Sequence, residues 1–184
     1  MESTKNCLKN NNLFIISLFL TIMDLEKAHY LVVTGIIIKN GKFLITKRSP
    51  TEKVFPGKWT VPGGKVEKKD YINSPKDTSE HWYNVFENVL KREVMEETGL
   101  EIKNIRYLTN LSFVRPDNIP TFIISLYADH HEGEVKLSED MTDHAWVTLE
   151  EAKNYDLIEG IYEELVMLDK VLKGKDIYQW SKSL

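Results

Sequence analysis

The sequence predicts an α/β domain in which a mixed β-sheet is sandwiched between helices. Two hairpin patterns and two segments with apolar residues at helical spacing carry this prediction. Residues 29–39 are a run rich in β-branched side chains, and Asn40 with Gly41 forms the sequence pair that most strongly favours a two-residue hairpin turn. Residues 43–46 then supply the returning strand.

The second half of the chain continues the alternation of strands and helices. A second hairpin is predicted between residues 105–113 and residues 121–127, with a turn marked by two prolines. Residues 145–147 predict a short strand, and residues 149–173 carry leucine and isoleucine at helical spacing before Gly174. A second main helix is predicted to end at Gly99.

Length and composition limit the number of domains and the class of partner that the chain can have. With 184 residues, of which 42% are hydrophobic, the chain forms one globular domain, which we expect at residues 29–184 after an extension at residues 1–28. The net charge of −4 gives no electrostatic basis for binding duplex nucleic acid. Cys7 is the single cysteine, so no internal disulfide forms, which fits a cytoplasmic protein.

The amino-terminal extension contains an apolar run at residues 13–23. A helix that spans a bilayer needs about 20 apolar residues, so we expect no stable membrane insertion. The residues that follow lack the small-x-small pattern of a signal cleavage site. Export or anchoring stays open as the lesser alternative, beside a translation start placed too early, with Met23 as the first residue, and an appendage that binds a partner.

Three acidic residues, Glu93, Glu96 and Glu97, are spaced at i, i+3 and i+4 just before Gly99. Residues three and four apart are neighbours on a helix surface, and hard divalent cations prefer such carboxylate oxygens. Most acidic helix faces are only solvated. Here the apolar stripe that includes Val89 leads into Glu93, so the acidic cluster is predicted to line a half-buried groove, where its charge needs a cation.

A glycine segment precedes this helix. Residues 59–67 predict a short strand that is interrupted by Pro62, Gly63 and Gly64. Glycine permits the close backbone approach that a phosphate or a metal ion requires. An ordinary structural turn is the alternative for this segment alone.

Together, the two segments resemble the Nudix hydrolase family. The family's box is Gly, five residues, Glu, seven residues, and then Arg-Glu-apolar-x-Glu-Glu-x-Gly-apolar. Residues 92–100 match every fixed position of the second half, and Gly64 matches the first glycine. Asp70 stands where the first Glu is expected, and an insertion of 14 residues lies between Gly64 and Arg92.

We expect the insertion to form a polar loop at residues 68–76. Residues 77–80, Asp-Thr-Ser-Glu, have the composition of a helix capping box, so they predict that extra turns of the acidic helix begin there. The sequence leaves open whether Asp70 replaces the family's first Glu or is only a loop residue.

The resemblance implies a mixed sheet between helices and a Mg²⁺- or Mn²⁺-dependent hydrolysis of a diphosphate linked to another group. It assigns the metal to Glu93, Glu96, Glu97 and the carbonyl of Gly64, and it assigns the orientation of the carboxylates to Arg92. In several subfamilies an acidic residue in the loop before a later strand acts as the base. Asp140 fits that position best and Glu139 next, although both would also suit an exposed acidic turn.

Substrate-binding candidates lie before the box. Arg48 follows a predicted strand and is placed to meet phosphate, while Phe55 is a candidate for stacking on a base. A surface arginine and a core phenylalanine are the alternatives. Gly63 and Gly64 complete the substrate-binding candidates. The partner is expected to be a small-molecule nucleotide, and the protein a monomer or a homodimer.

Several functions are compatible with these motifs. We expect hydrolysis of a nucleoside triphosphate or of another nucleoside diphosphate derivative by attack of water on phosphorus. The alternatives are a non-catalytic domain that senses a nucleotide, and a pyrophosphatase for ADP-ribose or nucleotide sugars. Residues 55–59 also suggest an isopentenyl diphosphate isomerase, but that enzyme needs a cysteine at its active site, and Cys7 lies far ahead of the domain.

Overall fold

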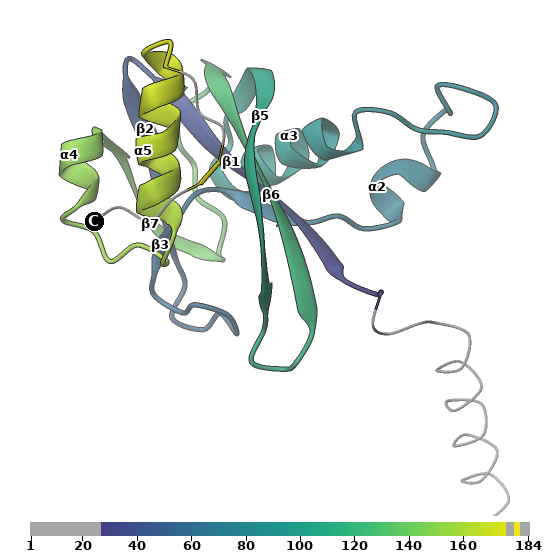
Figure 1. Ribbon diagram of the computed structural model, residues 1–184, viewed down its shortest axis with the longest axis horizontal. Helices are drawn as coiled ribbons and strands as arrows, with labels where there is room; N and C mark the ends of the chain where they lie inside the picture. Colours follow the sequence, from purple (N-terminus) through teal and green to yellow (C-terminus); the bar gives the residue numbers. More distant parts are fainter. Residues whose placement is uncertain (1–26, 176–178, 181–184) are drawn as a thin grey trace, which may run out of the picture.

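The computed structural model describes residues 27–175 and 179–180 (Figure 1). In chain order the elements are β1 (Tyr30–Lys39), β2 (Lys42–Arg48), β3 (Trp59–Thr60), β4 (Gly63–Lys65), α2 (Lys69–Ile72), α3 (Val85–Thr98), β5 (Glu101–Val114), β6 (Pro120–Glu132), β7 (Met141–Val147), α4 (Leu149–Ala152) and α5 (Ile161–Leu172).

The strands form one seven-stranded mixed sheet in the order β3-β2-β1-β6-β5, with β4 paired to β1 and β7 paired to β2. β1 and β6 run parallel, and all the other pairs are antiparallel. The mixed sheet predicted from the sequence is therefore confirmed, and so are both hairpins. Asn40 and Gly41 have φ of 52° and 74°, which is the left-handed conformation that the predicted turn requires.

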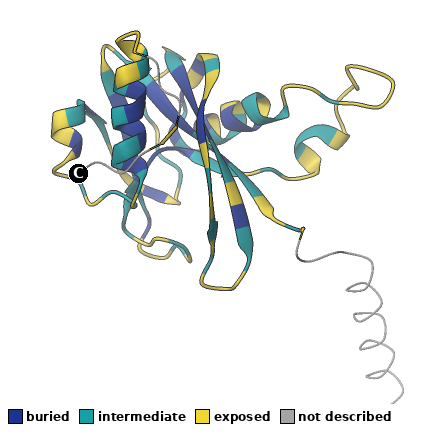
Figure 2. Ribbon diagram, in the orientation of Figure 1, coloured by how far each residue is buried: buried dark blue, intermediate teal, exposed yellow. Residues whose placement is uncertain are grey.

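Helices cover both faces of the sheet, as Figure 1 shows, and the core is divided into two layers (Figure 2). α5 packs on one face through Ile161, Leu165 and Leu168, against strand residues such as Ile36 and Tyr127. The other face carries α3 residues, among them Val89, Leu90 and Val94, together with Val33, Ile37, Leu44 and Leu126. Alternate residues of a strand point to opposite faces, which explains why neighbours such as Ile36 and Ile37 enter different layers.

The helix predicted over residues 149–173 is interrupted in the structure. α4 ends after one turn, and Gly160, with φ of 94°, precedes α5. Between them, the chain runs beside β3: the Trp59 N–H donates to the Asp156 carbonyl, and the Ile158 N–H donates to the Trp59 carbonyl. These hydrogen bonds to a distant strand replace the bonds of a continuous helix. The periodicity of residues 149–173 therefore predicts one helix where the structure has two.

The predicted start of the acidic helix is also wrong. α3 begins at Val85, after Asn84 in a left-handed conformation, rather than at residues 77–80. The Thr78 hydroxyl instead accepts hydrogen bonds from the backbone N–H groups of Glu80 and His81, which form a local turn. The insertion contains the short helix α2 and is not only a polar loop.

The apolar run at residues 13–23 lies outside the described residues, and the domain boundary at residue 28 stays a prediction. Within residues 27–175 and 179–180, the structure contains no helix with the length and apolar character needed to cross a membrane.

Candidate active site

α3 places the acidic cluster, Glu93, Glu96 and Glu97, at the edge of a buried stripe. Val89 and Val94 are buried against the sheet, so residues on the flank of the same face lie where the helix leaves the core. The helix ends at Gly99, whose φ of 68° is left-handed and whose N–H donates to the Met95 carbonyl.

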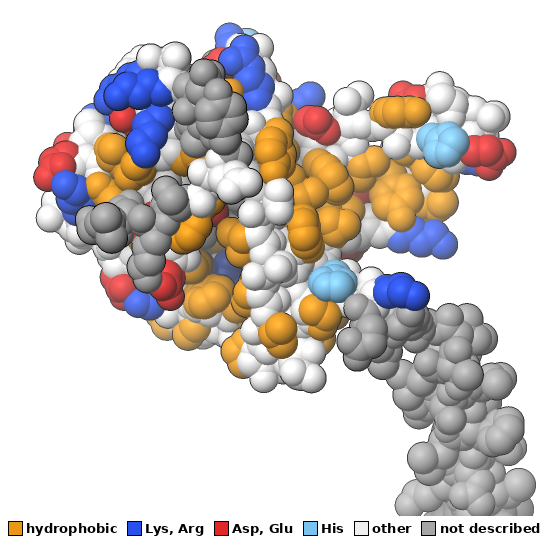
Figure 3. All heavy atoms as spheres, viewed as in Figure 1, with side chains coloured by type: hydrophobic (Ala, Val, Ile, Leu, Met, Phe, Trp, Pro, Cys, Tyr) orange, Lys and Arg blue, Asp and Glu red, His pale blue; other side chains and the backbone are white. Residues whose placement is uncertain are grey.

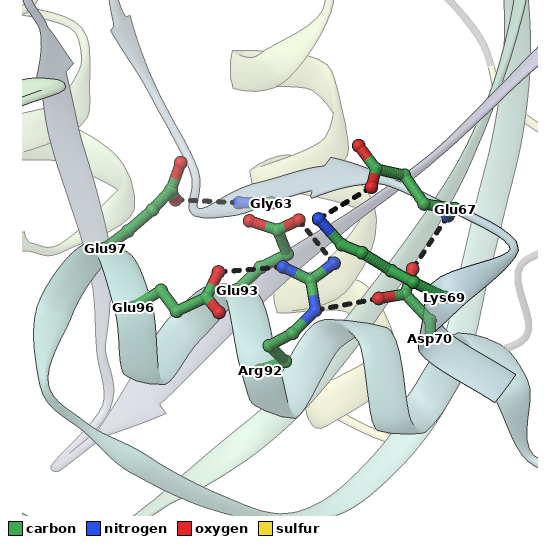
Figure 4. Close-up of polar contacts among 8 residues, drawn as sticks. All are labelled: Gly63, Glu67, Lys69, Asp70, Arg92, Glu93, Glu96 and Glu97. Carbon is green, nitrogen blue, oxygen red and sulfur yellow. Dashed lines mark hydrogen bonds and ion pairs between the residues drawn. The ribbon is translucent and has the colours of Figure 1, made fainter. Parts of the chain in front are cut away.

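The glycine segment, residues 62–64, lies directly against two of these carboxylates (Figure 4). The Gly63 N–H donates to Oε2 of Glu97 at 3.0 Å. A Cβ built on Gly64 would overlap the carboxylate of Glu93, so a side chain is excluded at this position. The Gly35 N–H donates to the Pro62 carbonyl at 2.9 Å and fixes the segment to β1.

Arg92 contacts three carboxylates at once (Figure 4). Its terminal nitrogens lie 2.8 Å from Oε1 of Glu93 and 2.8 Å from Oε2 of Glu96, and its Nε lies 3.0 Å from Oδ1 of Asp70. The last contact is an ion pair without the alignment of a hydrogen bond. The side chain of Asp70 is 4% exposed, and its carboxylate also accepts the Glu67 N–H at 2.7 Å. The insertion thus provides Asp70 as a partner of Arg92 and not merely as a loop residue.

Burial raises the pKa of Glu97 to about 8. The Gly63 hydrogen bond opposes this rise, the negative charges of Glu93 and Asp140 add to it, and the positive charge of Arg48 reduces it. Burial also raises the pKa of Glu93, against the effect of Arg92. Glu97 is therefore a carboxyl group with too little positive charge nearby, and Arg48 and Asp140 lie close enough to influence it.

The three carboxylates do not converge in the structure as the sequence predicts. In the described part of the chain, no three His, Cys, Asp or Glu side chains form a group that could hold a metal ion. The reason is that Glu93 and Glu96 turn toward Arg92, while Glu97 turns toward Gly63. The donor chemistry nevertheless fits a hard divalent cation, because the carboxylates of Glu93 and Glu97 lie against a backbone segment that is kept free of side chains at Gly64.

The loop with the predicted base candidates is held against this site. The Ser138 N–H donates to the Glu97 carbonyl at 3.1 Å, and the Ser49 N–H donates to the Asp140 carbonyl at 2.8 Å. These bonds attach the loop to the end of α3 and to the chain just after β2. Glu139 and Asp140 are exposed, and Asp140 is among the main charges that influence the pKa of Glu97.

The two substrate-binding candidates before the box have different surroundings. The Arg48 guanidinium donates to the Val54 carbonyl at 2.9 Å and pairs with Glu52, an interaction that the sequence did not reveal. Phe55 is 41% exposed and has an unusual φ of 52°. Its ring centroid lies 6.0 Å from that of Phe113, at the tip of the β5–β6 hairpin.

A mixed sheet between helices, with carboxylates of an acidic helix against a glycine segment, defines an α/β domain whose donor groups suit a divalent cation. The NUDIX domain model matches residues 29–167. The chain therefore belongs to the NUDIX family, and it is a Nudix hydrolase, of a family whose enzymes generally use divalent cations.

Individual relatives agree with this family. The chain is 30% identical over 139 residues to the nucleoside triphosphatase NudI of Escherichia coli K12, covering 68% of this chain and 86% of that protein. It is 29% identical over 137 residues to NudI of Klebsiella pneumoniae. Among solved structures, a MutT protein from Methanosarcina mazei superposes with a TM-score of 0.61 at 27% identity, covering 82% of this chain and 99% of that chain.

Proposed function

We propose that this chain is a Mg²⁺-dependent hydrolase, with Mn²⁺ as the alternative ion, that cleaves the diphosphate linkage of a nucleoside triphosphate or another nucleoside diphosphate derivative. The observation that carries the proposal is the contact of Glu93 and Glu97 with the glycine segment, where the charge of two half-buried carboxylates calls for a cation. The printed activity of the NudI relatives, nucleoside triphosphatase, supports a triphosphate substrate.

In this proposal Glu93, Glu96 and Glu97, with the Gly64 carbonyl, hold the ion. The bound ion offsets the negative charge that spreads over the phosphoryl oxygens in the transition state. Glu96 has to leave Arg92 to join the other ligands, and its 58% exposure leaves it room to turn. Arg92 keeps Glu93 oriented through the contact at 2.8 Å.

The reaction itself needs a base for the attacking water. Asp140, or Glu139 beside it, takes the proton as the water oxygen bonds to phosphorus and the bond from phosphorus to the bridging oxygen breaks. Asp140 is favoured because its charge already influences Glu97. Arg48, with Gly63 and Gly64, binds the phosphates, and Phe55 contacts the nucleoside. We further infer a cytoplasmic enzyme, either a monomer or a homodimer.

A substrate panel tests the proposal. The purified full chain is incubated with Mg²⁺ and with nucleoside triphosphates, ADP-ribose and nucleotide sugars, and the release of phosphate, pyrophosphate and nucleoside monophosphate is measured. We expect turnover of at least one triphosphate that stops in EDTA and returns with Mg²⁺. Turnover restricted to ADP-ribose or to nucleotide sugars would show that the substrate is one of these compounds and not a nucleoside triphosphate. Binding of nucleotides without turnover of any would overturn the proposal in favour of a sensing domain.

A further inference from the structure

A row of hydroxyl groups crosses the sheet on the face that α5 covers. Thr34 of β1 pairs with Ser125 of β6, which pairs with Thr109 of β5, so all three side chains point to the same side. The Thr34 and Ser125 hydroxyl oxygens lie 3.2 Å apart. Thr34 also pairs with Gly63. Neighbouring strands are separated by about 4.8 Å, which places Ser125 about 10 Å across the sheet from the glycine segment.

Two residues further along each strand, the same face is apolar. Val32, Ile123 and Leu111 form a second row across β1, β6 and β5, and all three are only partly buried. One more step along β5 reaches Phe113, whose ring meets that of Phe55 at 6.0 Å. Figure 3 shows hydrophobic side chains on this part of the surface, beside the lower half of the β5–β6 hairpin.

Val32, Ile123 and Leu111 thus form a partly buried apolar strip on this face of the sheet. A polar wall, Thr34 and Ser125, borders it on one side, and the aromatic pair Phe55 and Phe113 borders it on the other. The rows of Ser125 and Phe113 are four residues apart along the strands, which is about 13 Å. A flat ring with one polar edge fits these surroundings.

Glu164 of α5 lies behind the polar wall. It is 2% exposed and is hydrogen-bonded to Ser125, and its Oε2 has no hydrogen-bond partner among the described residues. It occupies a position on the helix where Ile161, Leu165 and Leu168 form the buried stripe. A buried acceptor left unpaired costs about 1 to 3 kcal/mol, so an apolar residue would serve packing better.

We propose that Glu164, a positioning residue acting through Ser125 and Thr34, decides which nucleobases are accepted beside this strip. The inference rests on the proposed hydrolysis of nucleotides and extends it to the choice of substrate. With phosphates at the glycine segment, the span of about 10 Å to Ser125 corresponds to the reach of a nucleoside from its 5′ oxygen to the far edge of its base.

Glu164 fixes the direction of the hydrogen bonds among these hydroxyl groups. A carboxylate only accepts hydrogen bonds, so Ser125 donates to an ionised Glu164, and Thr34 in turn donates to Ser125. The hydroxyl oxygen of the partly buried Thr34 then offers only lone pairs to the strip. Such a wall favours bases whose edge carries an amino group, and it disfavours a carbonyl edge.

The test compares variants of the full chain on ATP, GTP, CTP and UTP with Mg²⁺ at pH 8.5. Glu164→Gln keeps the size of the side chain but adds an amide donor, so Ser125 and Thr34 are free to reverse. We expect the preference for amino-bearing bases over uracil, measured as the ratio of kcat/KM values, to change about tenfold, through KM, with kcat altered less than about twofold. Glu163→Gln, one residue earlier on α5, is the matched control and should leave the ratio unchanged.

An equal fall of kcat/KM for all four nucleotides in Glu164→Gln would show a merely structural role, and an unchanged ratio would exclude Glu164 from base selection. Either result overturns the inference. If Glu164→Gln does not fold, Thr34→Val removes the half-buried hydroxyl alone, and the same loss of preference is required of it. If the parent binds the nucleotides without cleaving any, the proposed function fails, but their dissociation constants still compare the parent with its variants.

Discussion

Glu97→Gln provides the sharpest test of the electrostatics of the active site. The pKa of Glu97 in the folded, metal-free protein is about 8, against an ordinary value of 4.5, because the carboxyl group is buried. Between these two pH values the folded protein keeps a proton that the unfolded chain has released. Stability therefore falls as pH rises through this window, and the loss is complete above about pH 8.

The size of the loss follows from the shift. Three and a half pH units correspond to about 5 kcal/mol, and relaxation around the charged form reduces this to about 2 to 5 kcal/mol. Glutamine cannot ionise, and its carbonyl still accepts the Gly63 N–H. In EDTA, the Glu97→Gln variant should thus be as stable as the parent near pH 4.5 and more stable by about 2 to 5 kcal/mol at pH 8.5.

Urea unfolding at several pH values, with and without Mg²⁺, measures the pH dependence of stability and the stabilisation by the metal ion. Saturating Mg²⁺ at 100 times its dissociation constant should stabilise the parent by about 2.7 kcal/mol and stabilise the variant clearly less. Glu96→Gln is the matched control in EDTA, because it removes a carboxylate from the neighbouring position of the same helix, where the side chain is 58% exposed, and it should not reproduce the gain of about 2 to 5 kcal/mol at pH 8.5. Identical pH dependence in parent and Glu97→Gln would refute the assignment of a raised pKa to Glu97.

Three further substitutions test individual roles. Glu93→Gln keeps the shape of the side chain but removes a charge, so kcat should fall about a hundredfold or more in steady-state assays while nucleotide binding persists; full kcat would show that the acidic cluster is not catalytic. Gly64→Ala places a methyl group on the Glu93 carboxylate, so Mg²⁺ titrations should show weaker binding with little loss of helix content by circular dichroism, and unaltered binding would contradict the close approach. Asp140→Asn should lower kcat about tenfold more than Glu139→Gln, because Asp140 is among the main charges that influence Glu97, and the reverse order would transfer the role of base to Glu139.

The sequence determined the family, the mixed sheet and the helix that carries Glu93, Glu96 and Glu97. These features depend on local patterns: the Asn40-Gly41 turn sets one hairpin, alternation and β-branching mark the strands, and fixed spacing puts the acidic residues on one helix surface. Local interactions along the chain are sufficient for such features, so the residues themselves reveal them.

Only the tertiary structure decided which partners these residues meet. Arg92 turns two of the acidic residues toward itself, and Asp70 reaches it from an insertion whose local pattern suggested a different helix start. Glu164 has no motif around it, yet the fold sets it beside Ser125, from a strand far away in the sequence. Spacing along one helix cannot specify such contacts, because they depend on which distant segments pack together and on which charges burial leaves without water.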